Sequence, residues 1–158
     1  MKKYLLCLVV LLGWDPASAE DTVVLGRLWK NEPMEYVADT CPENSICLQS
    51  WWKWVIDIDK TVSGPPASGR IVAARPQHTS LYGPNLSRFR LFVLRPIVDQ
   101  KQRKRLRADY YLEDVSFMTE MYCLAQNPTE FGLSPERTFI SGDGEERRYC
   151  FELPDKDQ

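Results

Sequence analysis

The chain has 158 residues, of which 44% are hydrophobic, and its formal net charge is −2. This length suits one domain with a buried core, and the weak negative charge argues against a general binder of nucleic acid or of anionic membranes. Five cysteines and five tryptophans are the features of the composition that need an explanation.

The N-terminal segment has the three parts of a secretory signal peptide. Lys2 and Lys3 precede an apolar run at 4–13, and the small residues Ala17-Ser18-Ala19 stand before Glu20. The apolar run has ten residues, whereas a membrane-spanning helix needs about 20. We therefore predict a signal peptide at residues 1–19, cleavage after Ala19, and a periplasmic or secreted mature protein.

Cleavage would leave a mature chain at 20–158 with 18 basic and 21 acidic residues, and thus a net charge of −3. A short membrane anchor is the alternative, but Asp15-Pro16 interrupts the apolar segment. We expect residues 20–158 to form a soluble, single β-rich domain without a membrane span.

Cys7 lies in the predicted signal peptide, so the mature chain keeps Cys41, Cys47, Cys123 and Cys150. An even number after export indicates two disulfides, and three pairings are possible in principle. Cys41 and Cys47 enclose a short, turn-rich loop that could close locally, which favours pairing Cys123 with Cys150. A zinc site is the alternative, but the sequence has no C-x-x-C pair and the compartment would be oxidising.

The first half of the mature chain is predicted to be mainly strand. Residues 22–28 are β-branched and apolar, and a short extended piece is expected at 34–37. In residues 50–59, Trp52 and Trp54 begin an alternation of bulky apolar residues with mostly polar ones. That period of two is typical of a strand with one buried face.

The next strands are expected at 70–74, 89–94 and 106–112. The last two flank the polar segment 99–104 and are predicted to pair as a long hairpin, with Pro96 at a bulge or an edge position near its tip.

The C-terminal part contains an ambiguous segment followed by a hairpin. Residues 114–125 have apolar residues at helical spacing, so one or two turns of helix are plausible there, and 134–136 could form a single turn. Residues 138–140 and 147–153 flank a Gly-containing turn and are predicted to form a closing hairpin.

About seven short strands favour a mostly β fold, a small antiparallel β-barrel with a short helix and two disulfides. Three segments follow one another in a suggestive order: Val24-Leu25-Gly26-Arg27-Leu28, the strand from Trp52 that ends in Val62-Ser63-Gly64, and Arg70-Ile71-Val72.

This order resembles the opening of netrin-like modules, the OB-type barrels found in tissue inhibitors of metalloproteinases and in small secreted bacterial relatives. The resemblance covers roughly residues 22–75 and implies an OB-like barrel. The metalloproteinase inhibitors use a cysteine at the mature N-terminus to reach zinc, whereas this mature chain should begin at Glu20. Their inhibitory chemistry therefore does not carry over.

No group of residues forms a convincing catalytic set, and no cofactor or metal is predicted. His78 is the only histidine, and no serine lies in a nucleophile elbow. Residues 143–146 lack the ligand series of a calcium loop and are expected to form a turn. Asp57 and Asp59 point the same way from their strand and are expected to meet basic side chains. The available arginines are Arg88, Arg90, Arg105 and Arg107.

Two features indicate a binding surface. Lys101, Arg103, Lys104, Arg105 and Arg107 gather five positive charges beside the predicted hairpin tip, where an acidic protein, phosphate or a sulfated sugar could dock. The alternative is that these charges keep an exposed sheet edge from aggregating.

The tryptophans are the second feature. Trp52 and Trp54 are expected in the core, whereas Trp51 on the opposite face, and Trp29, could be exposed for a protein or sugar contact. Packing in the core or at its rim is the alternative. The predicted binding residues are Trp51, Arg103, Arg105 and Tyr111.

We expect a non-catalytic binding module that recognises another protein of the cell envelope, as an inhibitor, immunity protein or envelope-assembly subunit would. No nucleic-acid partner is expected. A carbohydrate or cell-wall binding module is one alternative, and it would need Trp29 and Trp51 exposed and coplanar on one face. A carboxylate-based hydrolase is another, and it would need Asp57 and Asp59 in a cleft with one pKa raised by burial.

Overall fold

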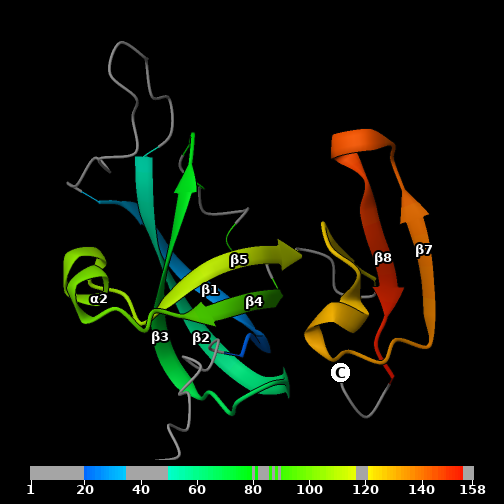
Figure 1. Cartoon of the computed structure of the whole chain (residues 1–158), viewed down its shortest axis with the longest axis horizontal. Helices are drawn as coiled ribbons and strands as arrows, with labels where there is room; N and C mark the ends of the chain where they lie inside the picture. Colours follow the sequence, from blue (N-terminus) through cyan, green and yellow to red (C-terminus); the bar gives the residue numbers. More distant parts are fainter. Residues whose placement is uncertain are drawn as a thin grey trace, which may run out of the picture.

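The computed structural model describes residues 20–34, 50–79, 81, 86, 88, 90–116 and 121–154. They form a closed five-stranded barrel, one short helix and a separate three-stranded sheet (Figure 1). The barrel strands are β1 (Thr22–Pro33), β2 (Ser50–Ser63), β3 (Gly69–Gln77), β4 (Leu91–Pro96) and β5 (Tyr110–Ser116), and the helix α2 is Gln100–Leu106. The small sheet contains β6 (Tyr122–Leu124), β7 (Arg137–Ser141) and β8 (Arg148–Glu152), with the 3-10 turns η1 (Pro128–Phe131) and η2 (Gly144–Glu146) between them.

The barrel has the strand order β1-β2-β3-β5-β4 and is mixed, not antiparallel as predicted. Four of its strand pairs are antiparallel, whereas β3 and β5 run parallel through Ala73↔Tyr110 and Ala74↔Tyr111. The physical reason is parity. Strand directions cannot alternate all the way around a closed ring of five, so at least one neighbouring pair must be parallel.

Strand β2 has the alternation that the sequence predicts. Trp52, Trp54 and Ile56 are buried inside the barrel, and the residues between them are only partly buried on its outer wall. Its neighbour β1 approaches closely at Gly26, where a Cβ atom would overlap the carbonyl oxygen of Asp57. This contact gives the glycine of the first strand a packing role.

Strands β1 and β4 are buried on both faces. Val24 and Phe92 point into the barrel core, whereas Val23 and Val93 belong to a second core between the barrel wall and the small sheet. Phe151 of β8 lies in that second core. Burial on both faces explains why residues 22–26 of β1 and 91–94 of β4 are almost continuously apolar instead of alternating, whereas the second half of β1 is polar and mostly exposed.

The predicted hairpin at 89–112 is correct in its antiparallel strands but wrong in its connection. Strands β4 and β5 pair antiparallel, yet helix α2 joins them in place of a short polar tip. Asp99 caps the helix by accepting a hydrogen bond from the backbone N–H of Lys101, at 2.8 Å, and Arg107 ends it in the left-handed region with φ 46°. Arg, Lys, Gln and Leu are strong helix formers, so a capped run of them folds as helix.

Several other boundaries differ from the prediction. Strands β1, β2 and β3 are each longer than expected. Pro96 is the last residue of β4 and not a bulge, since the irregularity in the pairing of β4 with β5 lies between Val93 and Leu94. Residues 122–124 form strand β6 instead of helix, and the single turn comes earlier, at η1. The closing hairpin is confirmed as β7 and β8.

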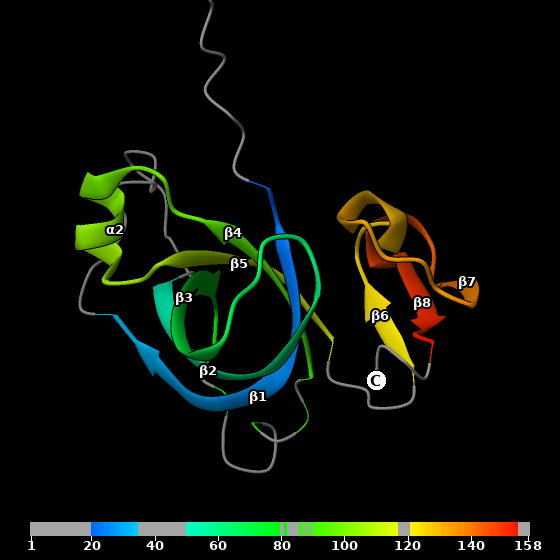
Figure 2. The same ribbon diagram turned by 90° about the horizontal axis from the view of Figure 1, so that it is seen from below.

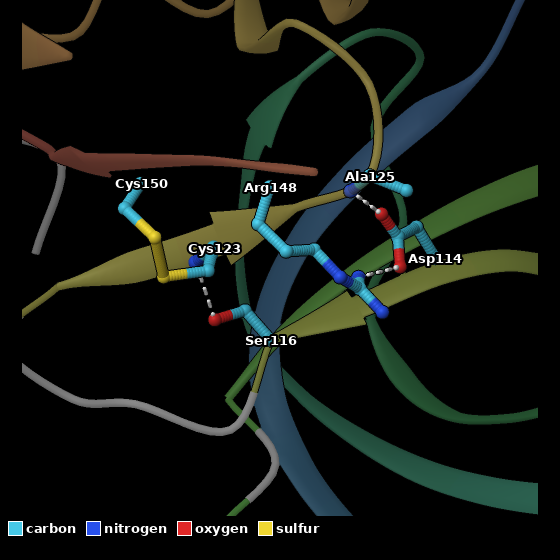
Figure 3. Close-up of a disulfide and its surroundings, with 6 residues drawn as sticks. All are labelled: Asp114, Ser116, Cys123, Ala125, Arg148 and Cys150. Carbon is cyan, nitrogen blue, oxygen red and sulfur yellow. Dashed lines mark hydrogen bonds and ion pairs between the residues drawn. A yellow bond between two sulfur atoms is a disulfide. The ribbon is translucent and has the colours of Figure 1, made fainter. Parts of the chain in front are cut away.

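Two of the predicted disulfide cysteines are bonded, and two fall outside the described residues. Cys123 and Cys150 form the disulfide between β6 and β8 (Figure 3). Cys41, Cys47, the predicted signal peptide at 1–19 and most of the extended piece at 34–37 lie outside the described part of the chain.

Two polar side chains of β5 attach the small sheet to the barrel. Asp114 is buried and accepts hydrogen bonds from the backbone N–H groups of Val115 and Ala125, at 2.8 and 2.6 Å, and it also meets Arg148 at 3.4 Å (Figure 3). The hydroxyl of Ser116 accepts from the N–H of Cys123 at 2.9 Å. Side-chain oxygens of β5 therefore satisfy a main-chain donor of β6 and that of Ala125, the residue that follows β6.

Replacing Asp114 with alanine should destabilise the protein strongly. The N–H groups of Val115 and Ala125 would lose their acceptor, and each unsatisfied buried donor costs about 1–3 kcal/mol. We expect the free energy of unfolding, measured by urea titration, to fall by about 2–4 kcal/mol. The matched control Asp59→Ala removes an exposed carboxylate and should change it by less than about 0.5 kcal/mol. Equal losses for both variants would contradict the role assigned to Asp114.

Candidate functional site

Trp51 and Tyr111, predicted as binding residues, contact each other on the outer wall of the barrel. Their ring centres are 6.1 Å apart and their planes are tilted by 47°. Both side chains are partly buried and pack against an apolar cluster beneath α2 that contains Ala74, Ile97 and Leu106. Trp51 therefore supports the helix instead of standing free on the surface, and packing at the rim is the interpretation that the structure favours.

The predicted basic cluster lies on and just after helix α2, and its members are not equivalent. Arg103 is paired with Asp109, with Nε–Oδ1 at 2.8 Å. Arg105 is partly buried and has an interaction of its own. Lys101, Lys104 and Arg107 are exposed and meet no acidic side chain within the described ranges. The positive potential of the helix therefore comes mainly from these three residues, which we call the α2 cations.

A groove of about 670 Å³ lies beside the start of the helix. Its lining residues come from the segment before β1, from the end of β4 with the residues that follow it, and from β5. They are Glu20, Asp21, Arg95, Pro96, Ile97, Val98, Asp99 and Tyr111. Val98 is 73% exposed, and Asp99 both lines the groove and caps α2.

Arg95 organises the polar side of this groove. Its guanidinium lies 3.1 Å from Asp21 and 3.3 Å from Glu113. The hydrogen bond to Asp21 raises the pKa of Arg95, and the carboxylate of Glu113 adds to that shift. The groove thus combines a fixed ion pair with apolar surface from Val98 and Tyr111, a mixture typical of protein-binding sites.

Asp57 and Asp59 do not meet the conditions for a hydrolase site. They lie on the outer wall of β2, where Asp57 accepts from Arg70 at 2.6 and 3.0 Å and Asp59 lies 4.0 Å from Arg27. The hydrogen bond from Arg70 lowers the pKa of Asp57 below its ordinary value, opposite to what a general acid needs. The expectation of basic partners is confirmed, but they are Arg70 and Arg27, not the four arginines named from the sequence.

Trp29 and Trp51 do not form a shared platform for a sugar. Trp29 is 60% exposed, but the guanidinium of Arg70 stands over its ring at 4.5 Å from the centroid. Trp51 packs against Tyr111 and the cluster beneath α2. Each ring is engaged in a contact with a different partner, so the two rings do not form one stacking surface.

Other candidate features have structural explanations. His78 is exposed, and residues 144–146 form the turn η2 between β7 and β8. In the part of the chain that the structure describes, no group of three or more histidine, cysteine or acidic side chains could hold a metal ion. Among the same residues, no helix is long and apolar enough to cross a membrane.

No family model matches the chain, and no curated protein or solved structure is significantly similar to it. Function must therefore be inferred from the arrangement of side chains on the barrel and on α2. The sequence pointed to this region through charge and aromatic content. The sequence did not indicate Arg95, Val98 and Asp99, because no motif or spacing marks them and only the fold brings them together in the groove.

The ion pair between Arg70 and Asp57 can be tested by titration. The pKa of Asp57 is lower in the folded state, so folding favours its charged carboxylate. The pair therefore stabilises the folded protein at pH values above the unfolded-state pKa of Asp57. This stabilisation is lost as the pH falls through the folded-state pKa. Arg70→Gln should return the pKa of Asp57, followed by NMR, to its ordinary range. Arg27→Gln should move it much less, because its influence is the weakest of those acting on Asp57. Equal shifts in the two variants would contradict this assignment.

Proposed function

We propose that this chain is an exported, non-catalytic binding module that recognises an acidic surface on another protein of the cell envelope. The observation that carries the proposal is a basic helix held rigidly on a closed barrel. The apolar side of α2 is anchored by Leu106 on the cluster with Trp51 and Tyr111, while the α2 cations face solvent. A helix fixed in this way presents its charges without a cost for ordering the backbone at binding.

The charges and the groove would make different contributions. Exposed cations raise the association rate with a negatively charged partner and make it sensitive to salt, whereas affinity comes from a few well-packed residues. Val98 and Tyr111 supply apolar surface to the groove, which Asp99, the cap of the helix, also lines. We therefore assign steering to the α2 cations and anchoring to the groove.

The strand order supports an OB-type barrel, the finer form of the fold that the resemblance to netrin-like modules implies. In OB-type barrels, ligands bind on the face of strands 2 and 3 and on the connections between strands 1 and 2 and between strands 4 and 5. Helix α2 lies in the connection between β4 and β5, and Trp51 lies on β2. The proposed surface therefore coincides with the position that this architecture uses for binding.

Export follows from the N-terminal segment and agrees with the disulfide between Cys123 and Cys150, since such bonds persist in oxidising compartments. We propose that Cys41 and Cys47 form a second one.

Sequencing the N-terminus of the exported protein tests the cleavage site. When the full chain is expressed in a bacterial host, the protein recovered from the periplasm should begin at Glu20, because small residues precede that position. Ala19→Lys should block processing and leave the larger form with the membranes. Recovery of the full-length chain from the cytoplasm would contradict the prediction of export.

The partner can be sought by affinity capture from envelope extract with tagged, exported protein. Lys101→Glu with Lys104→Glu reverses two α2 cations and should weaken capture of a specific protein by about tenfold or more at low salt. The control Arg27→Glu with Lys60→Glu makes the same change in net charge at the far end of β2 from Trp51 and should keep the partner.

Equal loss in both variants would mean that net charge alone matters, which contradicts a specific surface on α2. Recovery of glycan fragments without a protein partner would replace the proposal with the carbohydrate-binding alternative.

A further inference from the structure

Strand β7 lies at the outer edge of the small sheet, on the side of the molecule opposite to α2 (Figure 1, Figure 2). Within the described residues its only strand neighbour is β8. All five residues of β7 are exposed, and two are large apolar side chains, Phe139 at 47% and Ile140 at 53% exposure. The strand thus offers both main-chain groups and apolar side chains to solvent.

The hydrogen-bond pattern shows which main-chain groups of β7 face the open side. The N–H of Cys123 donates to Ser116, away from β8, and the Cα atoms of Cys123 and Cys150 are 4.0 Å apart. Both facts identify a pair without mutual main-chain hydrogen bonds, so the N–H and C=O of Cys150 point toward β7. The main-chain N–H and C=O of its β7 partner, Phe139, point toward β8. Because these groups alternate in direction along a strand, those of Thr138 and Ile140 face the open edge.

This edge lacks the usual protection against pairing. Natural edge strands are blunted by being very short, or by charged side chains, proline, bulges or inward-pointing charges. Strand β7 has five residues, close to the ordinary length of a strand. Strand β7 reads Arg-Thr-Phe-Ile-Ser, with its one charge at the first position and a centre of residues that favour strand. Such an edge is suited to accept another strand.

We propose that β7 pairs antiparallel with β7 of a second copy of this chain, about a two-fold axis at Phe139. In this register Thr138 lies opposite Ile140 of the other copy, and the outward N–H and C=O groups of these residues bond each other. Phe139 lies opposite Phe139 of the other copy, forming an aromatic cross-strand pair at the centre. The two small sheets become one continuous sheet with a closed, isologous interface.

Charge complementarity identifies a second copy as the occupant. In this register Arg137 lies opposite Ser141 of the other copy and beside the acidic turn that follows it. That turn carries Asp143, Glu145 and Glu146, all exposed. The two-fold axis repeats the contact, so two arginines meet two acidic turns. Each side also carries the other sign, with Glu136 before Arg137 and with Arg147 and Arg148 after the turn, all exposed. No two residues of like charge lie directly opposite each other in this register.

Sedimentation equilibrium of the protein recovered after export tests the proposal. The wild-type protein should be a dimer at micromolar concentration, and Ile140→Pro should shift it to monomer. Proline removes the outward N–H of residue 140 but no bond to β8. The control Val98→Glu removes another highly exposed apolar side chain, in the groove beside α2, and should stay dimeric. A monomeric wild-type protein, or a dimer that Ile140→Pro leaves intact, would overturn the proposal.

Cross-linking tests the register by the formation of a covalent dimer instead of by the loss of the dimer. Phe139→Cys should form a covalent dimer under mild oxidation, because position 139 meets itself across the axis, whereas Ile140→Cys should not. Arg137→Glu should weaken the dimer, and adding Asp143→Arg should restore it. Cross-linking through position 140 but not 139, or no rescue by the charge exchange, would overturn the proposed pairing.

Discussion

The double-sided burial of β1 and β4 is the constraint on which the rest of the structure depends. Val23, Leu25, Leu91 and Val93 face outward from a closed barrel and are nevertheless buried, because the small sheet covers them. Exposing such side chains would cost about 1.5–3 kcal/mol each, whereas a partly exposed ion pair such as Arg148–Asp114 contributes about 0–1 kcal/mol. The apolar contact therefore holds the sheet on the barrel, and Asp114 and Ser116 fix its register by satisfying the donors of β6.

Covering this side of the barrel leaves two surfaces of opposite chemistry on the remainder. At α2, packing is carried by Leu106 and Trp51, so Lys101, Lys104 and Arg107 face solvent. Arg103 is paired with Asp109, and Arg105 has an interaction of its own. At β7, the sheet ends in a strand with apolar side chains and open main-chain groups. The first surface would act through long-range electrostatics and the second through directional hydrogen bonds, so the two proposed contacts can form independently.

Much of the fold could be predicted from local sequence pattern. The alternation in β2 and the hairpin of β7 and β8 depend on short-range signals. The pairing of Cys123 with Cys150, 27 residues apart, was predicted only because Cys41 and Cys47 enclose a short loop that could close locally. The parallel β3–β5 pair could not be predicted, since it follows from the number of strands that close the ring. Helix α2 was missed because antiparallel flanking strands suggested a turn, and only the cap at Asp99 and the buried Leu106 distinguish a helix. The contact of Trp51 with Tyr111 likewise depends on that parallel pairing.

The position of the charges decides between two explanations of the basic cluster. Protection of an exposed sheet edge would require the charges to lie along an unpaired strand. They lie instead on and beside a helix, and the strands that flank it, β4 and β5, are paired on both sides within the closed barrel. The strand that does have an open edge, β7, carries only Arg137 at its start. Because the charges are placed where no edge needs protection and are sparse where one does, protection of a sheet edge does not explain the basic cluster, and this placement supports the two proposed contacts.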